Sequence, residues 1–235
     1  HTRFKCDWSS DVCSSDLGLL ENRAKVFYTV GVNRDFDQRV VGWVNGLRAL
    51  AKHGRHAPYE MVALEHVLHE MRLFKSRAEI DLMREAARIA ARAHVRAMRS
   101  CRPGMHEYEI QAEIEHEFRR ARAEPSYLPI VGGGANGCIL HYRENEAVLR
   151  AGELLLIDAG CEYECYASDI TRTFPINGKF TKAQRALYEL VLEANRAAIA
   201  AVRPGNHWNL PHETAVQVLT TGLVRLDRKS TRLNS

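Results

Sequence analysis

The sequence lacks the features that would tie a protein to a membrane or to nucleic acid. No apolar run approaches the roughly 20 residues that a helix needs to span a bilayer, and the N-terminal region has no apolar core of a signal peptide. The net charge is only +4, from 33 basic and 29 acidic residues scattered along the chain. This balance is too weak to indicate binding to nucleic acid or to a membrane surface, so we expect neither partner.

Cysteine spacings typical of a metal knuckle or a disulfide framework are also absent. In a chain of this length, six cysteines without a C-x-x-C pair indicate free thiols in a reducing compartment. We therefore expect a cytoplasmic protein. Cys161 and Cys165 lie close in sequence to Asp158, and we interpret them as ordinary thiols in a loop between two strands. The six positions are Cys6, Cys13, Cys101, Cys138, Cys161 and Cys165.

Several catalytic signatures are missing as well. The eleven histidines form no H-E-x-x-H zinc motif, and the chain has neither a Walker A lysine nor a G-x-S-x-G elbow. A G-x-G-x-x-G pattern does occur at Gly132, Gly134 and Gly137. However, residues 138–142 (CILHY) predict a strand after it, whereas a dinucleotide site needs a helix N-terminus there. The pair Asn136-Gly137 instead favours a hairpin turn.

The two ends of the chain differ from everything between them. Residues 1–17 (HTRFKCDWSSDVCSSDL) and 228–235 (RKSTRLNS) show no helical or strand periodicity and closely resemble translated sequencing-adapter read-through. We interpret both ends as artefacts, to be left out of fold reasoning like an expression scar; real disordered termini are the alternative. On the first interpretation the gene extends beyond both ends, and this chain is an internal fragment.

What the sequence does contain is a pattern of two helices followed by strands. Ser76 and Glu79 form a capping box before a predicted helix, which stops ahead of the tripeptide Arg-Pro-Gly at 102–104. A second helix follows, with Ile110, Ile114 and Phe118 at fourfold spacing. Strand-like pieces come next, at 127–131, 138–142, 153–160 and 168–174.

The same pattern then starts again. Thr181 and Gln184 form a second capping box, the helix after it ends at a second Arg-Pro-Gly at 203–205, and a further helix starts near Pro211. We infer an internal duplication and an α/β (α+β) fold whose second half is truncated after its second helix. Ahead of the first half, residues 25–32 predict a strand and residues 36–54 an amphipathic helix that ends at Gly54.

Two aspartates stand in the predicted strands. Asp158 shares a strand face with Leu154 and Leu156, and Asp169 begins the next strand. A hairpin about residues 161–166 (CEYECY) would bring both carboxylates within reach of one metal site. Without a cation, two buried carboxylates would force one of them to protonate, and oxygen ligands favour hard divalent ions. A structural aspartate at a strand end and a separate surface aspartate are the alternative.

The stretches HEMRLFKS (69–76), NGCILHYRENE (136–146) and LLLIDAGCEYECYASDITRTFPINGKFT (154–181) strongly resemble the aminopeptidase P (Xaa-Pro aminopeptidase) family of pita-bread metallopeptidases. The resemblance covers about residues 25–226. It implies a pita-bread fold of two related halves, which agrees with the duplication. It further implies that residues 18–68 are the remnant of an N-terminal creatinase-like α/β domain and residues 69–227 a partial catalytic domain.

The resemblance also implies roles for three residues. Asp158 matches the carboxylate that binds one metal ion, and Asp169 matches the one that bridges two ions, for which Mn²⁺ is the expected metal. His141 matches the histidine that contacts substrate and helps to transfer a proton to the leaving nitrogen; a satisfied core histidine at a strand end is the alternative. The implied reaction releases the N-terminal residue from peptides with proline in second position, through a metal-bridged hydroxide.

The chain departs from the family in one respect that bears on activity. The family completes its metal site with a histidine and two glutamates nearer the C-terminus, and the sequence turns adapter-like before reaching them. We therefore expect this chain to be inactive alone, although its parent, which we expect to be a homo-oligomer, would be an enzyme. Prolidase, which cleaves Xaa-Pro dipeptides with the same ligands, and a non-catalytic binding protein on the same scaffold are alternatives.

Overall fold

The computed structural model describes residues 14–233 of the chain, and the burial of side chains over 17–227. The chain divides into two compact units between Arg77 and Ala78. The domain boundaries predicted from the resemblance, 18–68 and 69–227, stay predictions. Secondary structure extends into both adapter-like ends, because α1 (Ser14–Leu20) begins within the first and α7 (Leu210–Leu233) reaches into the second; the origin of those ends stays a prediction too.

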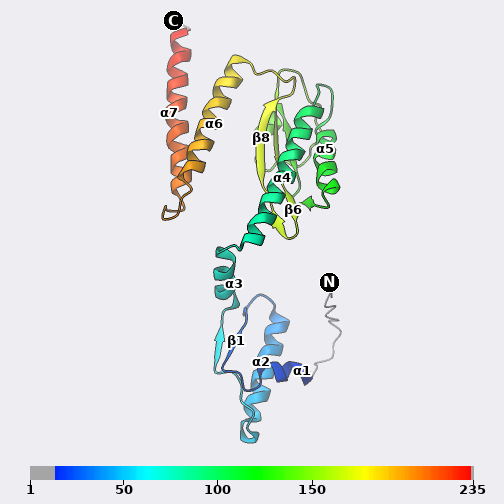
Figure 1. The fold of residues 1–235 in the computed structure, drawn as a ribbon, viewed down its shortest axis with the longest axis vertical. Coiled ribbons are helices and arrows are strands. Elements are labelled where there is room, and N and C mark those ends of the chain that lie inside the picture. The colour runs from blue at the N-terminus through cyan, green and yellow to red at the C-terminus, as the bar shows by residue number, and fades with distance from the viewer. Residues whose placement is uncertain (1–13, 234–235) are drawn as a thin grey trace. The chain divides into compact units, whose positions relative to one another are not determined.

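The first unit holds a two-stranded parallel sheet and a small apolar cluster (Figure 1). The predicted helix over 36–54 is confirmed as α2, which a short 3-10 turn continues to the left-handed Gly54. The predicted strand over 25–32 is correct only for its first three residues, because the chain turns at Gly31, whose N–H donates to the Asp37 carboxylate. The elements are β1 (Lys25–Phe27), α2 (Arg34–Ala49), η1 (Ala51–His53), β2 (Glu60–Val62) and α3 (Leu64–Leu73).

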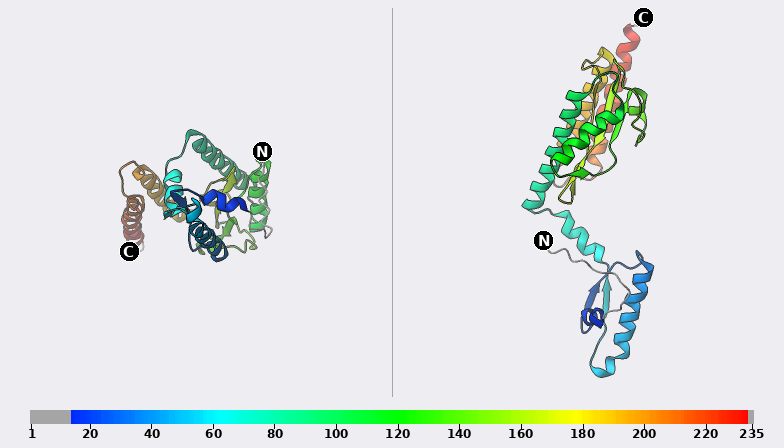
Figure 2. Two further views of the ribbon diagram at one scale, coloured as in Figure 1. Left: turned by 90° about the horizontal axis from the view of Figure 1, so that it is seen from below. Right: turned by 90° about the vertical axis from the view of Figure 1, so that its right-hand side faces the viewer.

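The second unit is built from two long helices, two three-stranded sheets and a helical hairpin (Figures 1 and 2). Its helices are α4 (Arg77–Ser100), α5 (Glu107–Arg120), α6 (Lys182–Ala201) and α7, with the short 3-10 helix η2 (Gly134–Cys138). Its strands are β3 (Glu124–Pro125), β4 (Ile130–Gly133), β5 (Leu154–Ala159), β6 (Cys161–Tyr163), β7 (Tyr166–Ala167) and β8 (Ile170–Pro175).

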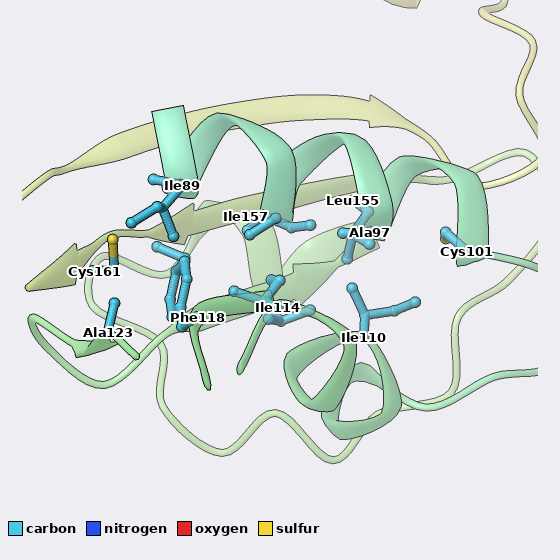
Figure 3. Close-up of a cluster of buried hydrophobic side chains, with 14 of the residues drawn as sticks. Ile89, Ala97, Cys101, Ile110, Ile114, Phe118, Ala123, Leu155, Ile157 and Cys161 are labelled. Carbon is cyan, nitrogen blue, oxygen red and sulfur yellow. The ribbon is translucent and has the colours of Figure 1, made fainter. Parts of the chain in front are cut away.

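The main sheet has the order β4-β5-β8, with both neighbours of β5 antiparallel to it. Burial alternates along β5: Leu155, Ile157 and Ala159 are buried, whereas the residues between them are only half-buried. Figure 3 shows the buried residues packing against α4 and α5, with Phe118 and Ile114 between helix and sheet. One face of the sheet therefore belongs to the core, and the other, which carries Asp158, is free to form a site.

The repeated tripeptide marks the same turn in both places. After α4 and after α6, the glycines of the two Arg-Pro-Gly tripeptides, Gly104 and Gly205, have φ angles of 93° and 85°, which favour glycine. Each turn leads into a second helix, α5 or α7. The capping box predicted at Thr181 is present, since its hydroxyl accepts from the Gln184 N–H and the Gln184 side chain accepts from the Thr181 N–H.

The strand predicted over 138–142 is wrong. Residues 134–138, including the Asn136-Gly137 pair that we expected to form a hairpin turn, form the 3-10 helix η2, and His141 follows in a turn with φ of 56°. The apolar Ile139 and Leu140, which suggested a strand, are exposed, Leu140 to 86%. Side-chain hydrogen bonds to this segment, rather than strand pairing, determine its path. The 3-10 helix and the turn resemble the predicted strand in one respect. No α-helix follows the three glycines, so no helix N-terminus is available there to bind a pyrophosphate.

Candidate metal centre

Asp158 and Asp169 lie side by side on the open face of the main sheet. Asp158 is half-buried on β5 and pairs with Thr171 on β8, and Asp169 is exposed two residues before Thr171. Side chains two apart along a strand point to the same side. The structure therefore brings the two carboxylates together, as the predicted hairpin requires, and their role as metal ligands stays a prediction.

The connection between the two strands is what fixes this pairing. β6 and β7 form the predicted hairpin, with Glu164 and Cys165 at its tip in left-handed conformation. At its base, Gly160 passes so close to Ser168 that a Cβ on Gly160 would lie 1.7 Å from the Ser168 carbonyl oxygen. Only glycine permits this approach, which places Asp169 beside Asp158.

Tyr127 joins the two carboxylates. Its hydroxyl oxygen lies 2.5 Å from Oδ1 of Asp158 and 2.8 Å from Oδ1 of Asp169. Burial, followed by these two hydrogen bonds, raises the pKa of the Tyr127 hydroxyl, so the phenol keeps its proton. Ser126 holds the tyrosine in place, because its N–H donates to the Gly160 carbonyl (3.0 Å) and its hydroxyl to the Ser168 carbonyl (3.0 Å).

Sequence reasoning missed Tyr127. It lies in PSYLP, between Pro125 and Pro129. The strand predicted over 127–131 is wrong for its first three residues, because β4 begins only at Ile130. A tyrosine in such a short connection gives no periodic signal that distinguishes it from a surface residue. Its position beside the two carboxylates becomes visible only when the turn at Ser168 and the strand end at Gly160 come together in space.

His141 opens on the same space as the two aspartates. A cavity of about 240 Å³ is lined by Tyr127, His141, Asp158 and Asp169, together with Leu128, Ile130 and Arg143. His141 itself is exposed. All three residues singled out in the sequence therefore lie at one cavity, and His141 reaches it from a turn rather than from the expected strand.

The donor set at this cavity fits part of a metal site. A phenol has one proton, so Tyr127 cannot by itself offset the repulsion between two ionised carboxylates, and a cation at the cavity would do so. Carboxylate oxygens are ligands for hard divalent ions. However, among residues 14–233 no group of three or more His, Cys, Asp and Glu side chains is placed to hold a metal ion.

The cysteines near Asp158 do not contribute to the cavity. Cys161 is fully buried in the core, with its Sγ 3.4 Å from the Ala86 carbonyl oxygen. Burial raises the pKa of the Cys161 thiol, which disfavours the thiolate that a metal needs. Cys165 is exposed at the hairpin tip. Neither lines the cavity, so both fit the interpretation as ordinary thiols. The predicted loop position is correct only for Cys165, because Cys161 is the first residue of β6.

Comparison with known proteins identifies the family. The family model described as metallopeptidase family M24 matches residues 81–231, which is most of the second unit. The chain belongs to metallopeptidase family M24. It is also 49% identical over 209 residues to the Xaa-Pro aminopeptidase of Escherichia coli, a match that covers 88% of this chain and 47% of that protein.

Solved structures agree with the sequence match. The structure of Pseudomonas aeruginosa aminopeptidase PepP is 56% identical, with a TM-score of 0.84 over 90% of this chain and 48% of that one. Zinc-substituted E. coli aminopeptidase P in complex with product is 48% identical, with a TM-score of 0.83 over 89% of this chain and 48% of that one.

These matches confirm the resemblance to aminopeptidase P and the pita-bread fold predicted from the motifs. The chain spans about half the length of the relatives that it matches. In the part of the chain that the structure describes, no helix is long and apolar enough to cross a membrane.

Proposed function

We propose that this M24 chain supplies half of the active site of a metalloaminopeptidase that releases the N-terminal residue from peptides with proline in second position. The observation that carries this function is the convergence of Asp158 and Asp169 on one phenol, in a cavity that His141 also lines. The names of the relatives, Xaa-Pro aminopeptidase and aminopeptidase P, support the substrate class.

Each of the four residues has a distinct task in this function. Asp158 would be a ligand for one divalent ion, and Asp169, the more exposed of the two, would be a ligand shared by a pair of ions. Tyr127 would orient the carboxylates through its single proton. His141 would contact the substrate and deliver a proton to the proline nitrogen as it leaves. When bound, the ions would supply an activated water and stabilise the negative charge that develops on the carbonyl oxygen.

Manganese is the metal that we propose. The ligands that this chain offers are carboxylate oxygens, and the thiols of Cys161 and Cys165 lie outside the cavity. Such a donor set favours Mn²⁺ or Mg²⁺ over a thiolate-bound zinc ion. The free thiols of Cys101, Cys138, Cys161 and Cys165 further support a reducing compartment, and we propose the cytoplasm.

The chain by itself would be inactive. Two carboxylates cannot hold a pair of divalent ions tightly, and among the described residues no third ligand joins them. Purified chain supplied with Mn²⁺ should therefore release no N-terminal residue from an Xaa-Pro-Xaa tripeptide, as measured by chromatography of the products. Robust turnover would show that the described residues suffice and that the ligand count is wrong.

A chimaera tests the function itself. Residues 69–226 would replace the matching segment of the E. coli Xaa-Pro aminopeptidase, to which the chain is 49% identical. The chimaera should cleave Xaa-Pro-Xaa tripeptides with Mn²⁺. Asp158→Asn and Asp169→Asn should each lower kcat/KM by about 1000-fold or more, and His141→Ala by about 100-fold or more.

The matched control is Glu162→Gln, which neutralises an exposed carboxylate on the same hairpin. It should leave kcat/KM within about twofold, as surface substitutions away from a site usually do. A folded chimaera that binds Mn²⁺ but cleaves no Xaa-Pro bond would refute the function. Cleavage of Xaa-Pro dipeptides in preference to tripeptides would instead assign the prolidase reaction.

A further inference from the structure

A buried carboxylate lies directly behind the segment that carries His141. Glu107, the first residue of α5, is fully buried, and its side chain accepts four hydrogen bonds. Oε1 accepts from the Gly133 N–H (2.7 Å) and from Nδ2 of Asn136 (3.1 Å). Oε2 accepts from the Tyr142 hydroxyl (2.8 Å) and from the Ala147 N–H (3.0 Å). These four donors replace the hydration that burial removes.

The four donors all come from one stretch of chain. They lie at its start (Gly133 and Asn136), beside His141 (Tyr142) and at its end (Ala147). Among the described ion pairs none involves Glu107, so the polar partners that the structure gives its side chain are those of this segment. A single side chain thus fixes three separate points of residues 133–147.

This segment needs such support because its backbone is unfavourable. His141 has φ of 56°, in the left-handed region that costs a residue with a Cβ roughly 1 kcal/mol or more. Strand pairing does not hold His141 in place, since η2 and a turn occupy this stretch. The side chain of Tyr142, anchored on Glu107, fixes the residue directly after it.

We propose that Glu107 is a positioning residue: its buried carboxylate holds residues 133–147 in the conformation that presents His141 to the cavity of Asp158 and Asp169. Glu107 does not line that cavity, so it would act only through His141. Its importance for the reaction rests on the proposed function, whereas its effect on the conformation of His141 can be measured without turnover.

The test compares Glu107→Gln with Glu146→Gln in the full chain. Glutamine has the shape of glutamate but offers one acceptor oxygen, so two of the four donors must lose their partner. Glu146 lies in the same segment and is exposed, so its substitution removes the same charge without touching the network. Histidine ring signals would be recorded by NMR with ¹³C-labelled histidine, and His141→Gln would identify the His141 signal.

In Glu107→Gln the His141 signal should shift or broaden, because the ring samples several positions. The signal of His94, buried in the core of the same unit, should stay in place and thereby show that the fold is intact. Amide exchange at Gly133 and Ala147 should accelerate by about tenfold or more, with no change at Ile157 in β5. Glu146→Gln should match the wild type in every signal.

Tyr142→Phe provides a second variant in case Glu107→Gln fails to fold. It removes one of the four donors and should shift the His141 signal in the same direction but less. An unchanged His141 signal in folded Glu107→Gln, or a His94 signal that shifts equally, would overturn the positioning role. An unfolded Glu107→Gln together with an unchanged His141 signal in Tyr142→Phe would overturn it as well. A chimaera without peptidase activity would refute the proposed function but not these conformational results.

Discussion

The cavity is built from two regions that hold their side chains in different ways. Asp158 lies in the β5–β8 ladder of six consecutive residue pairs, and Asp169 directly precedes Ile170, the first β8 residue of that ladder. His141 is placed by residues 133–147, where a few buried polar side chains, Glu107 and Asn145 above all, take the place of a ladder. The ladder distributes its strength over many backbone hydrogen bonds, whereas the segment depends on single side chains.

The difference predicts how each region should fail. In the ladder, loss of one side chain leaves the backbone pairing intact, so only a backbone clash should be severe. In the segment, loss of one buried polar side chain leaves its hydrogen-bond partners buried, with neither a protein partner nor water. Damage to the segment should also remain local, because none of residues 133–147 belongs to the core cluster.

The largest effect is expected from a clash at the end of the ladder, where the β6–β7 hairpin begins. Gly160→Ala would place a Cβ 1.7 Å from the Ser168 carbonyl oxygen, which neither backbone can avoid without separating Asp169 from Asp158. We expect a loss of about 3 kcal/mol or more in the free energy of unfolding, measured by urea titration. Gly42→Ala, in α2 with open space around it, should be neutral or slightly stabilising. A Gly160→Ala variant as stable as the wild type would contradict the close approach of Gly160 to Ser168.

The next effect concerns the segment. Asn145 is buried; it accepts from the Val131 N–H (3.0 Å) and donates to the carbonyl oxygens of Pro129 and of the Gln111 side chain (both 2.8 Å). Asn145→Ala would leave these groups without a hydrogen-bond partner and should lower the free energy of unfolding by about 2–3 kcal/mol.

The matched control for Asn145→Ala is Glu146→Ala, its exposed neighbour, which should change the free energy by about 0.5 kcal/mol at most. Amide exchange should accelerate in residues 133–147 and not in β5. Uniform acceleration across both regions would mean that the segment and the ladder form one cooperative element.

The same contrast explains what could be predicted from the sequence. Alternation in LLLID predicted the face of Asp158, because a ladder imposes a period of two, and the hairpin expected about residues 161–166 predicted that Asp169 would lie beside it. Residues 138–142 also looked like a strand, and that prediction failed because Glu107, some 30 residues away in sequence, determines the path of this segment. Tyr127 escaped for the same reason: its partners are distant in sequence and leave no local pattern.

A smaller effect should appear with pH beneath the ladder. His94 of α4 is buried; Nδ1 donates to the Ala90 carbonyl (2.9 Å) and Nε2 has no hydrogen-bond partner in the described structure. Burial lowers the pKa of His94, although nearby carbonyls of Ile157 and Ile170 favour the charged ring. The unfolded chain therefore takes up a proton more readily than the folded one.

The contribution of His94 to the free energy of unfolding should be fully present above about pH 6.5, the ordinary pKa of histidine, and should fall as the pH drops below that value. The slope should be at most about 1.4 kcal/mol per pH unit for one group. Thermal unfolding between pH 7.5 and 5.5 measures it, and His94→Gln should remove this part of the dependence. If wild type and His94→Gln lost stability in parallel, the uptake would belong to other groups.

The smallest effect concerns Tyr127, which lies where the ladder meets the cavity. Tyr127→Phe removes the one proton that lies between the carboxylates of Asp158 and Asp169. It should lower the free energy of unfolding by about 1 kcal/mol in the absence of metal, since the site is partly open to solvent.

A divalent ion would relieve the repulsion between the two carboxylates that the variant leaves. Millimolar Mn²⁺ should therefore raise the melting temperature of Tyr127→Phe more than that of the wild type, because binding and relief are reciprocally linked. In Tyr127→Phe combined with Asp158→Asn, one negative charge is gone, and the additional rise in melting temperature with Mn²⁺ should disappear. Equal gains in wild type and Tyr127→Phe would mean that the phenol only fills space, and that the two carboxylates need no positive partner to remain side by side.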